Sequence, residues 1–213
     1  MIQTMALEAT HIRFALDLKN KYGVKDIEKY VAGSIYPDSR YVTEVDRMAT
    51  HPENYKDWDM KRIDDFRKGW FAHLLADNIQ WDITKELLPR VFEGSQGQGG
   101  ERWIKYTAIK ILQDLDDVKK FDISQYLPYL AHIENPNGED MKRMKQYYDI
   151  FPLMYGRPNA VDIDSCYRMW KAFGINDELA AKVKSQAEGY SQDESIMDTI
   201  LKIYPAMLLR ANS

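Results

Sequence analysis

The chain has 213 residues, of which 45% are hydrophobic and 29% are charged, and its formal net charge is −4. This composition supplies enough apolar side chains for a sizeable core and excludes a disordered chain. The acidic balance argues against a protein that binds duplex nucleic acid, because such proteins are usually basic.

We expect neither a leader nor a membrane span. Its N-terminal stretch has no basic segment followed by an apolar run, and no stretch reaches the roughly 20 apolar residues that a transmembrane helix needs. The single cysteine, Cys166, cannot form an intramolecular disulfide, which fits a reducing compartment. We therefore expect a cytoplasmic protein in which Cys166 packs in the core; a nucleophilic thiol is the less favoured alternative.

The N-terminal part has the periodicity of amphipathic helices interrupted by two loops. Apolar residues at near-helical spacing indicate the helices, Gly23 and Gly33 mark two helix ends, and Pro37 and Pro52 mark the loops. The predicted elements are helices over residues 10–22, 26–32, 61–80 and 87–91, and loops over 34–40 and 50–55.

The rest of the chain begins with a glycine-rich stretch, EGSQGQGG, which predicts a flexible loop over residues 93–100. Helices are then predicted over 101–120, 124–131, 140–153, 164–173, 177–188 and 192–209. Alternating strand patterns are scarce, so we predict an all-α protein with one multi-helix domain, residues 1–213. Residues 1–92 would hold a metal site, and residues 101–213 would complete the helical core or, through the apolar run 204–209, form a homo-oligomer interface.

Three of the four histidines lie in the N-terminal third, beside aspartates that could share a metal ion with them. Histidine and aspartate are common ligands of divalent metals such as zinc. Two of the candidates are four residues apart on a predicted helix and so point from one face. Each candidate taken singly is more typical of a core histidine or a turn aspartate, so the prediction depends on their combination. The candidate ligands are His11, Asp38, His51, His73 and Asp77.

The order and spacing of these residues resemble the zinc-dependent phospholipase C superfamily, which also contains fungal single-strand nucleases. The shared pattern is a histidine on the first helix, Gly-x-x-x-Pro-Asp, His-Pro in a loop, and Gly-x-x-x-His-x-x-x-Asp on a helix. Here it is carried by His11, residues 33–38, His51-Pro52 and residues 69–77, and it covers about residues 8–82. The resemblance implies an all-helical fold and a zinc cluster. Asp38, His51, His73 and Asp77 would form one site, and Asp77 would bridge to a second ion that also takes His11.

The chain departs from this family in its further ligands. The family completes its second ion with an N-terminal tryptophan, whereas no tryptophan precedes His11. Family members also carry another histidine beyond the His-x-x-x-Asp pair, where this chain has Trp81-Asp82, and then a His-x-x-x-Glu pair. The only later histidine here, His132, is followed by Ile133-Glu134. We therefore expect one or two divalent ions, with zinc preferred.

The expected function follows from such a site. A divalent ion polarises a phosphoryl oxygen and lowers the pKa of water, and Asp38 or Asp77 would orient or deprotonate that water. Arg40 and Lys68 are the predicted cations for a substrate phosphate. We expect a metal-dependent hydrolase that acts on a small phosphodiester or phosphomonoester.

Two other functions stay open. A helical phosphohydrolase of the HD type also uses histidine and aspartate ligands, but its adjacent His-Asp pair is absent here. A non-catalytic helical protein that acts in binding or regulation, with a degenerate metal site, would explain the missing downstream ligands. Convergence of the five candidate ligands in space would favour a metal site over the degenerate scaffold.

Overall fold

A computed structural model describes residues 8–97, 99–157 and 161–213. These residues form helices and connecting segments without a β-strand, which confirms the predicted all-α class. Among the described helices, none is long and apolar enough to cross a membrane. Residues 1–7 of the predicted metal-site half and residue 98 of the predicted loop 93–100 lie outside the described part of the chain.

Six of the longer helices begin at polar residues whose side chains accept a hydrogen bond from the backbone of the first turn, as N-caps do, whereas α6 (Glu101–Lys120) begins after Gly100 without a side-chain cap. These caps are Asp26, Asp64, Asp140, Asp162, Asn176 and Asp193. The α-helices are α1 (Glu8–Leu18), α2 (Ile27–Ile35), α3 (Arg40–Thr43), α4 (Arg47–Thr50), α5 (Asp65–Leu87), α6 (Glu101–Lys120), α7 (Met141–Tyr155), α8 (Ile163–Ala172), α9 (Asp177–Ser191) and α10 (Glu194–Asn212). Short 3-10 helices are η1 (Tyr36–Ser39), η2 (Glu53–Asp57), η3 (Pro89–Phe92), η4 (Ile123–Gln125) and η5 (Leu127–Ala131).

The structure differs from several sequence predictions about local structure. The segment 34–40 is not a loop, because α2 runs on past Gly33 and passes directly into η1 and α3. Pro37 fits there since it lies in the first turn of η1, where a helix has no use for its missing N–H.

Two predicted helices are 3-10 helices instead. Residues 124–131 form η4 and η5, and Pro128 lies in the first turn of η5. Residues 87–91 contain the end of α5 and most of η3. The predicted loop 50–55 begins at the end of α4 and contains the start of η2.

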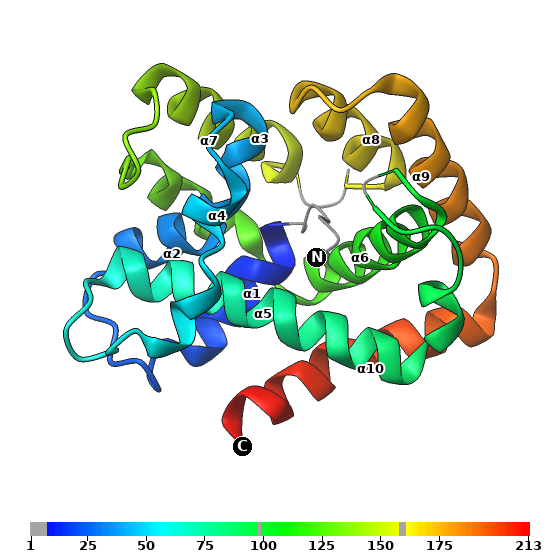
Figure 1. Cartoon of the computed structure of the whole chain (residues 1–213), viewed down its shortest axis with the longest axis horizontal. Helices are drawn as coiled ribbons and strands as arrows, with labels where there is room; N and C mark the ends of the chain where they lie inside the picture. The colour runs from blue at the N-terminus through cyan, green and yellow to red at the C-terminus, as the bar shows by residue number, and fades with distance from the viewer. Residues whose placement is uncertain (1–7, 98, 158–160) are drawn as a thin grey trace.

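Helices α2 and α5 pack with their backbones in contact because each presents a glycine to the other. A Cβ atom at Gly33 would lie 2.0 Å from the carbonyl oxygen of Phe66. A Cβ atom at Gly69 would lie 2.0 Å from the carbonyl oxygen of Tyr30. Only glycine fits these positions without pushing the helices apart. Figure 1 shows α5 crossing the middle of the molecule, with α10 running past it near the C-terminus.

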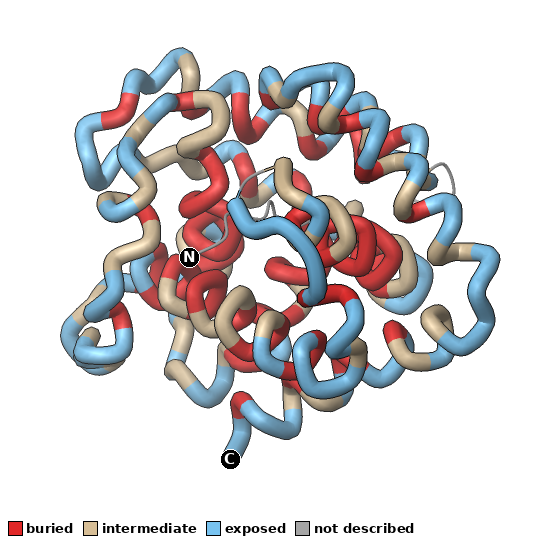
Figure 2. The backbone as a smooth tube through the Cα atoms, turned by 45° about the vertical axis from the view of Figure 1, so that its right-hand side comes forward, coloured by how far each residue is buried: buried red, intermediate tan, exposed pale blue. Residues whose placement is uncertain are grey.

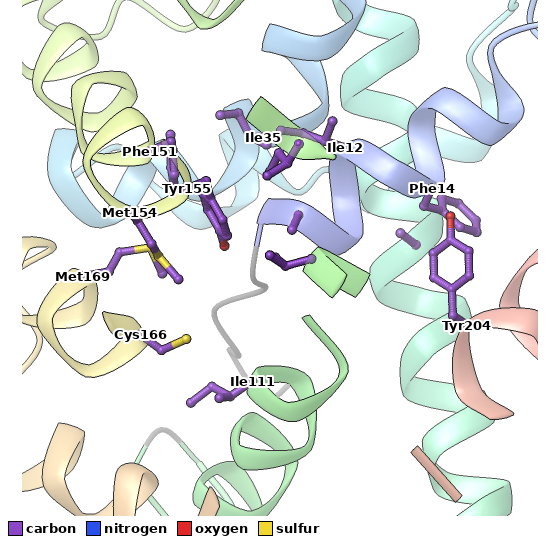
Figure 3. Close-up of a cluster of buried hydrophobic side chains, with 14 of the residues drawn as sticks. Ile12, Phe14, Ile35, Ile111, Phe151, Met154, Tyr155, Cys166, Met169 and Tyr204 are labelled. Carbon is purple, nitrogen blue, oxygen red and sulfur yellow. The ribbon is translucent and has the colours of Figure 1, made fainter. Parts of the chain in front are cut away.

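One large apolar core contains residues from both parts of the chain, before and after the predicted loop 93–100. Buried residues gather in the interior, and the outer turns are exposed (Figure 2). In Figure 3, side chains of α1, α6, α7 and α8, among them Ile12, Ile111 and Tyr155, surround a shared interior. Cys166 lies in this core, where burial raises the pKa of its thiol well above the usual value, so it packs as predicted. Tyr204 and Met207 of the run 204–209 are buried as well.

A buried polar contact ties α1 to α6. The Thr10 backbone N–H donates to Asp114 (2.7 Å), and the Thr10 hydroxyl donates to Asp117 (2.8 Å). The Tyr155 hydroxyl donates to the other oxygen of Asp114 (2.9 Å). Burial is the largest cause of the raised pKa values of the two carboxyls, about 7 for Asp114 and about 6 for Asp117.

Gly69→Ala should lower the free energy of unfolding by about 3 kcal/mol or more, because the added methyl group forces α2 and α5 apart. Gly189→Ala is the matched control: Gly189 is an exposed glycine inside α9 with nothing within 4 Å of an added Cβ. This control should stabilise the protein by about 0.5–1 kcal/mol through helix propensity. Urea denaturation followed by circular dichroism measures both, and equal effects would contradict the backbone contact.

Asp114→Asn should change how stability depends on pH. The folded pKa of Asp114, about 7, lies above the unfolded value, so the folded state binds more protons between these pKa values. The contribution of Asp114 to stability is therefore fully present below the unfolded pKa and is lost as pH rises through about 7. The free energy of unfolding of the wild type, minus that of Asp114→Asn, should fall by about 2–3 kcal/mol from pH 5 to pH 8. A difference that stays constant in urea titrations over this range would contradict the assignment.

Candidate metal centre

His73 lies one helical turn after Gly69, on the face of α5 that meets α2. Its Nδ1 atom is 2.9 Å from the carbonyl oxygen of Ser34. Since a carbonyl oxygen only accepts, Nδ1 carries the proton and donates it, which leaves a lone pair on Nε2. This Nε2 atom is buried and has no hydrogen-bond partner. Asp77 follows one turn later on the same face, with its Oδ2 atom 3.6 Å from the His73 Nε2 atom.

Asp38 and His51 approach from two other elements. Asp38 lies on η1, directly after α2, with its Oδ2 atom 4.0 Å from the Nε2 atom of His73. His51 follows α4, and its Nδ1 atom is 2.9 Å from the hydroxyl of Thr50, which itself donates to a backbone carbonyl. His51 Nδ1 is therefore the donor in that pair, and its Nε2 atom faces the Oδ2 atom of Asp77 at 3.8 Å.

His11 comes from α1 and lies flat against His73, with the ring centroids 3.9 Å apart and the planes 12° from parallel. Its Nε2 atom is 3.7 Å from the Oδ1 atom of Asp77. Neither ring nitrogen of His11 has a hydrogen-bond partner, although the residue is 2% exposed. Burial, and then the charge of His73, hold the pKa of His11 well below its usual value. A buried neutral imidazole without partners is costly unless another group binds it.

All five predicted ligands thus meet in space. Two triads, His11–His73–Asp77 and Asp38–His51–His73, each have ligand atoms within 4.8 Å of one another. The printed separations of 3.6–4.0 Å are too long for hydrogen bonds. They approach the spacing of about 3.4 Å between the ligands of a tetrahedral ion with bonds of about 2.0–2.1 Å. The nitrogen and carboxylate donors and the unpartnered ring nitrogens fit a divalent cation such as zinc.

Lys110 belongs to the same cluster, although the histidine and aspartate motifs do not single it out. Its Nζ atom is 2.8 Å from the Oδ1 atom of Asp77, and its side chain is 2% exposed. Burial alone would raise the pKa of Asp77, but the charge of Lys110 and the nearby His51 imidazole hold this pKa well below the usual range. The sequence does contain a signal for Lys110, because polar residues recur three or four apart on α6, at Thr107, Lys110, Asp114 and Asp117.

The two cations predicted to bind phosphate lie in different places. The Arg40 guanidinium lies over the ring of Tyr41, 3.9 Å from its centroid. Burial, and then the charge of Asp38, raise the pKa of the Tyr41 hydroxyl. Lys68 instead forms an ion pair with Asp65 (2.6 Å). Five residues before His73 it points about 140° around the helix from it, so the predicted phosphate contact of Lys68 is not supported.

The cluster opens to solvent along one edge. The side chain of Asp77 is 22% exposed and that of His51 is 10% exposed, whereas Asp38, His73 and His11 are 4% exposed or less. A ligand from solvent would therefore reach the cluster beside Asp77. No known family model, curated protein or solved structure matches the chain. Any assignment of function depends on the geometry and chemistry of this cluster.

Lys68→Met should lower the free energy of unfolding by about 2 kcal/mol, because Asp65 loses the cation that neutralises it. Asp65 also accepts hydrogen bonds from the backbone N–H groups of Lys25 and Asp26, so it fastens the start of α2. Lys61→Met, at an exposed lysine just before α5, is the control and should leave stability nearly unchanged. Loss of phosphate or metal binding in Lys68→Met without loss of stability would instead restore a functional role for Lys68.

Proposed function

We propose that this protein is a metal-dependent hydrolase of phosphoric esters in which Asp38, His51, His73 and Asp77 hold a divalent ion, preferably zinc. The observation that carries the proposal is the convergence of two imidazole nitrogens and two carboxylates from α5, η1 and the end of α4. Backbone and hydroxyl contacts on Nδ1 turn the Nε2 lone pairs of both histidines inward, as at metal sites.

The residues of the cluster and its surroundings would have different roles in phosphoester hydrolysis. A bound divalent ion supplies polarisation of a phosphoryl oxygen and a lowered pKa for water. Asp77, whose pKa is held low, stays ionised near neutral pH and would orient the attacking water by accepting a hydrogen bond from it. Asp38 would take this role if Asp77 serves only as a ligand. Arg40, two residues after Asp38 in the chain, would bind a phosphate oxygen.

A second candidate is a binding or regulatory protein in which the ion only stabilises the fold. The observation in its favour is the burial of the donors, because four protein ligands complete a tetrahedral shell and closed sites are typical of structural zinc. The two candidates agree on metal binding and differ on hydrolysis.

Wild-type protein purified without added metal should contain about one equivalent of a divalent metal by elemental mass spectrometry, and the His73→Ala, Asp77→Ala double variant should contain none. The matched control is His132→Ala with Asp82→Ala. This control removes the only histidine outside the cluster and an exposed aspartate of α5, the helix that carries His73 and Asp77. The control protein should keep its metal. No metal in the wild type, even after reconstitution, would rule out both candidates.

The metal-loaded wild type should hydrolyse bis(p-nitrophenyl) phosphate or p-nitrophenyl phosphate, lose this activity to a chelator and regain it with zinc. The double variant should lose on the order of 100-fold or more in kcat/KM, whereas the control should not. Metal binding without any hydrolysis would favour the binding or regulatory protein.

A further inference from the structure

The carboxylate of Asp77 faces two different environments. Its Oδ2 atom faces the Nε2 atoms of His73 (3.6 Å) and His51 (3.8 Å). Its Oδ1 atom faces the Nε2 atom of His11 (3.7 Å) and the ammonium group of Lys110 (2.8 Å). One side therefore offers only metal ligands, and the other side already contains a positive charge.

The Oδ1 side has ligand types for a second metal ion. His11, His73 and Asp77 place their ligand atoms within 4.8 Å of one another, and both ring nitrogens of His11 lack a hydrogen-bond partner. A cation bound between His11 and the Oδ1 atom would lie close to the Lys110 ammonium. Repulsion between cations is strong where protein excludes water, and both His11 and Lys110 are 2% exposed.

Lys110 is fixed in this position by the packing of α6. Its side chain is buried, and the ammonium group lies 5.4 Å from the centroid of the Tyr106 ring. One turn further along α6, Asp114 accepts a hydrogen bond from the backbone of Thr10, the residue before His11. The contact that joins α1 to α6 therefore helps to place Lys110 and His11 beside the same oxygen atom of Asp77, Oδ1.

We propose that Lys110 takes the place of a second metal ion, so that the centre binds one divalent ion and its ammonium group excludes another from the His11 side. The inference rests on the proposed function, because it assumes the first ion. Charge balance supports it: with the carboxylates of Asp38 and Asp77, one divalent ion and one ammonium group leave a net charge of +1. A second divalent ion would raise this net charge to +3 in a largely buried site.

The test is the metal stoichiometry of four proteins: wild type, Lys110→Met, Lys110→Arg and Lys119→Met. Methionine keeps much of the apolar stem of Lys110 without its charge, arginine keeps the charge, and Lys119 is an exposed lysine of the same helix. Each apoprotein is loaded with zinc, freed of excess by gel filtration and analysed by elemental mass spectrometry; circular dichroism checks the fold. We expect one equivalent in wild type, Lys110→Arg and Lys119→Met. Lys110→Met should bind two, the first at least about tenfold more tightly than the wild type does.

The outcomes separate this inference from the proposed function. One equivalent in both wild type and Lys110→Met, or two in the wild type, would overturn the role of Lys110 and leave the proposed hydrolase in place. No bound zinc in any of the four proteins would overturn both. If Lys110→Met does not fold, Lys110→Gln gives the same comparison, and the count for the wild type still decides.

Discussion

The direct contact between the backbones of α2 and α5 is the constraint on which the candidate centre depends. Gly33 and Gly69 cost helix stability, roughly 1 kcal/mol each relative to alanine, yet they let the two helices approach until carbonyl oxygens fill the space of a side chain. Asp38 follows the end of one helix, and His73 lies one turn beyond the glycine of the other. Any separation of the helices would pull these donors apart, and the hydrogen bond from His73 to Ser34 would break with them.

Without a bound ion, the cluster would destabilise the folded protein. Desolvation penalises buried carboxylates, and polar atoms without partners lose the hydrogen bonds that water would give them. Lys110 offsets part of this cost by its ion pair with Asp77, but the ring nitrogens of His11 and the Nε2 atom of His73 have no hydrogen-bond partner. His132, outside the cluster, is less buried and has such a partner in Glu134. A bound cation would give a partner to the ring nitrogens and carboxylate oxygens of the cluster.

The sequence predicts the all-α class and names five potential ligands that lie close together in the structure, because helical periodicity and motif spacing are local properties of the chain. Sequence patterns fail where tertiary contacts decide the outcome. Gly33 resembles a helix end, which assigns residues 34–40 to a loop, yet this glycine serves the approach of α5. Lys68 is close to His73 in sequence, but it occupies another face of α5 and pairs with Asp65. The sequence gives no pairing for Lys110, because its partner Asp77 lies 33 residues away on another helix.

The donors and their counter-charge come from opposite sides of the glycine-rich segment at residues 93–100. Every candidate ligand lies between His11 and Asp77, whereas the lysine that neutralises Asp77 belongs to α6. A fragment that stopped before this segment would contain all the candidate ligands but lack the lysine that neutralises Asp77. The net charge of the centre is thus a property of the assembled domain. Asp77 gains its counter-charge only when α6 packs beside α1 and α5, and in any folding order that begins at the N-terminus this step comes late.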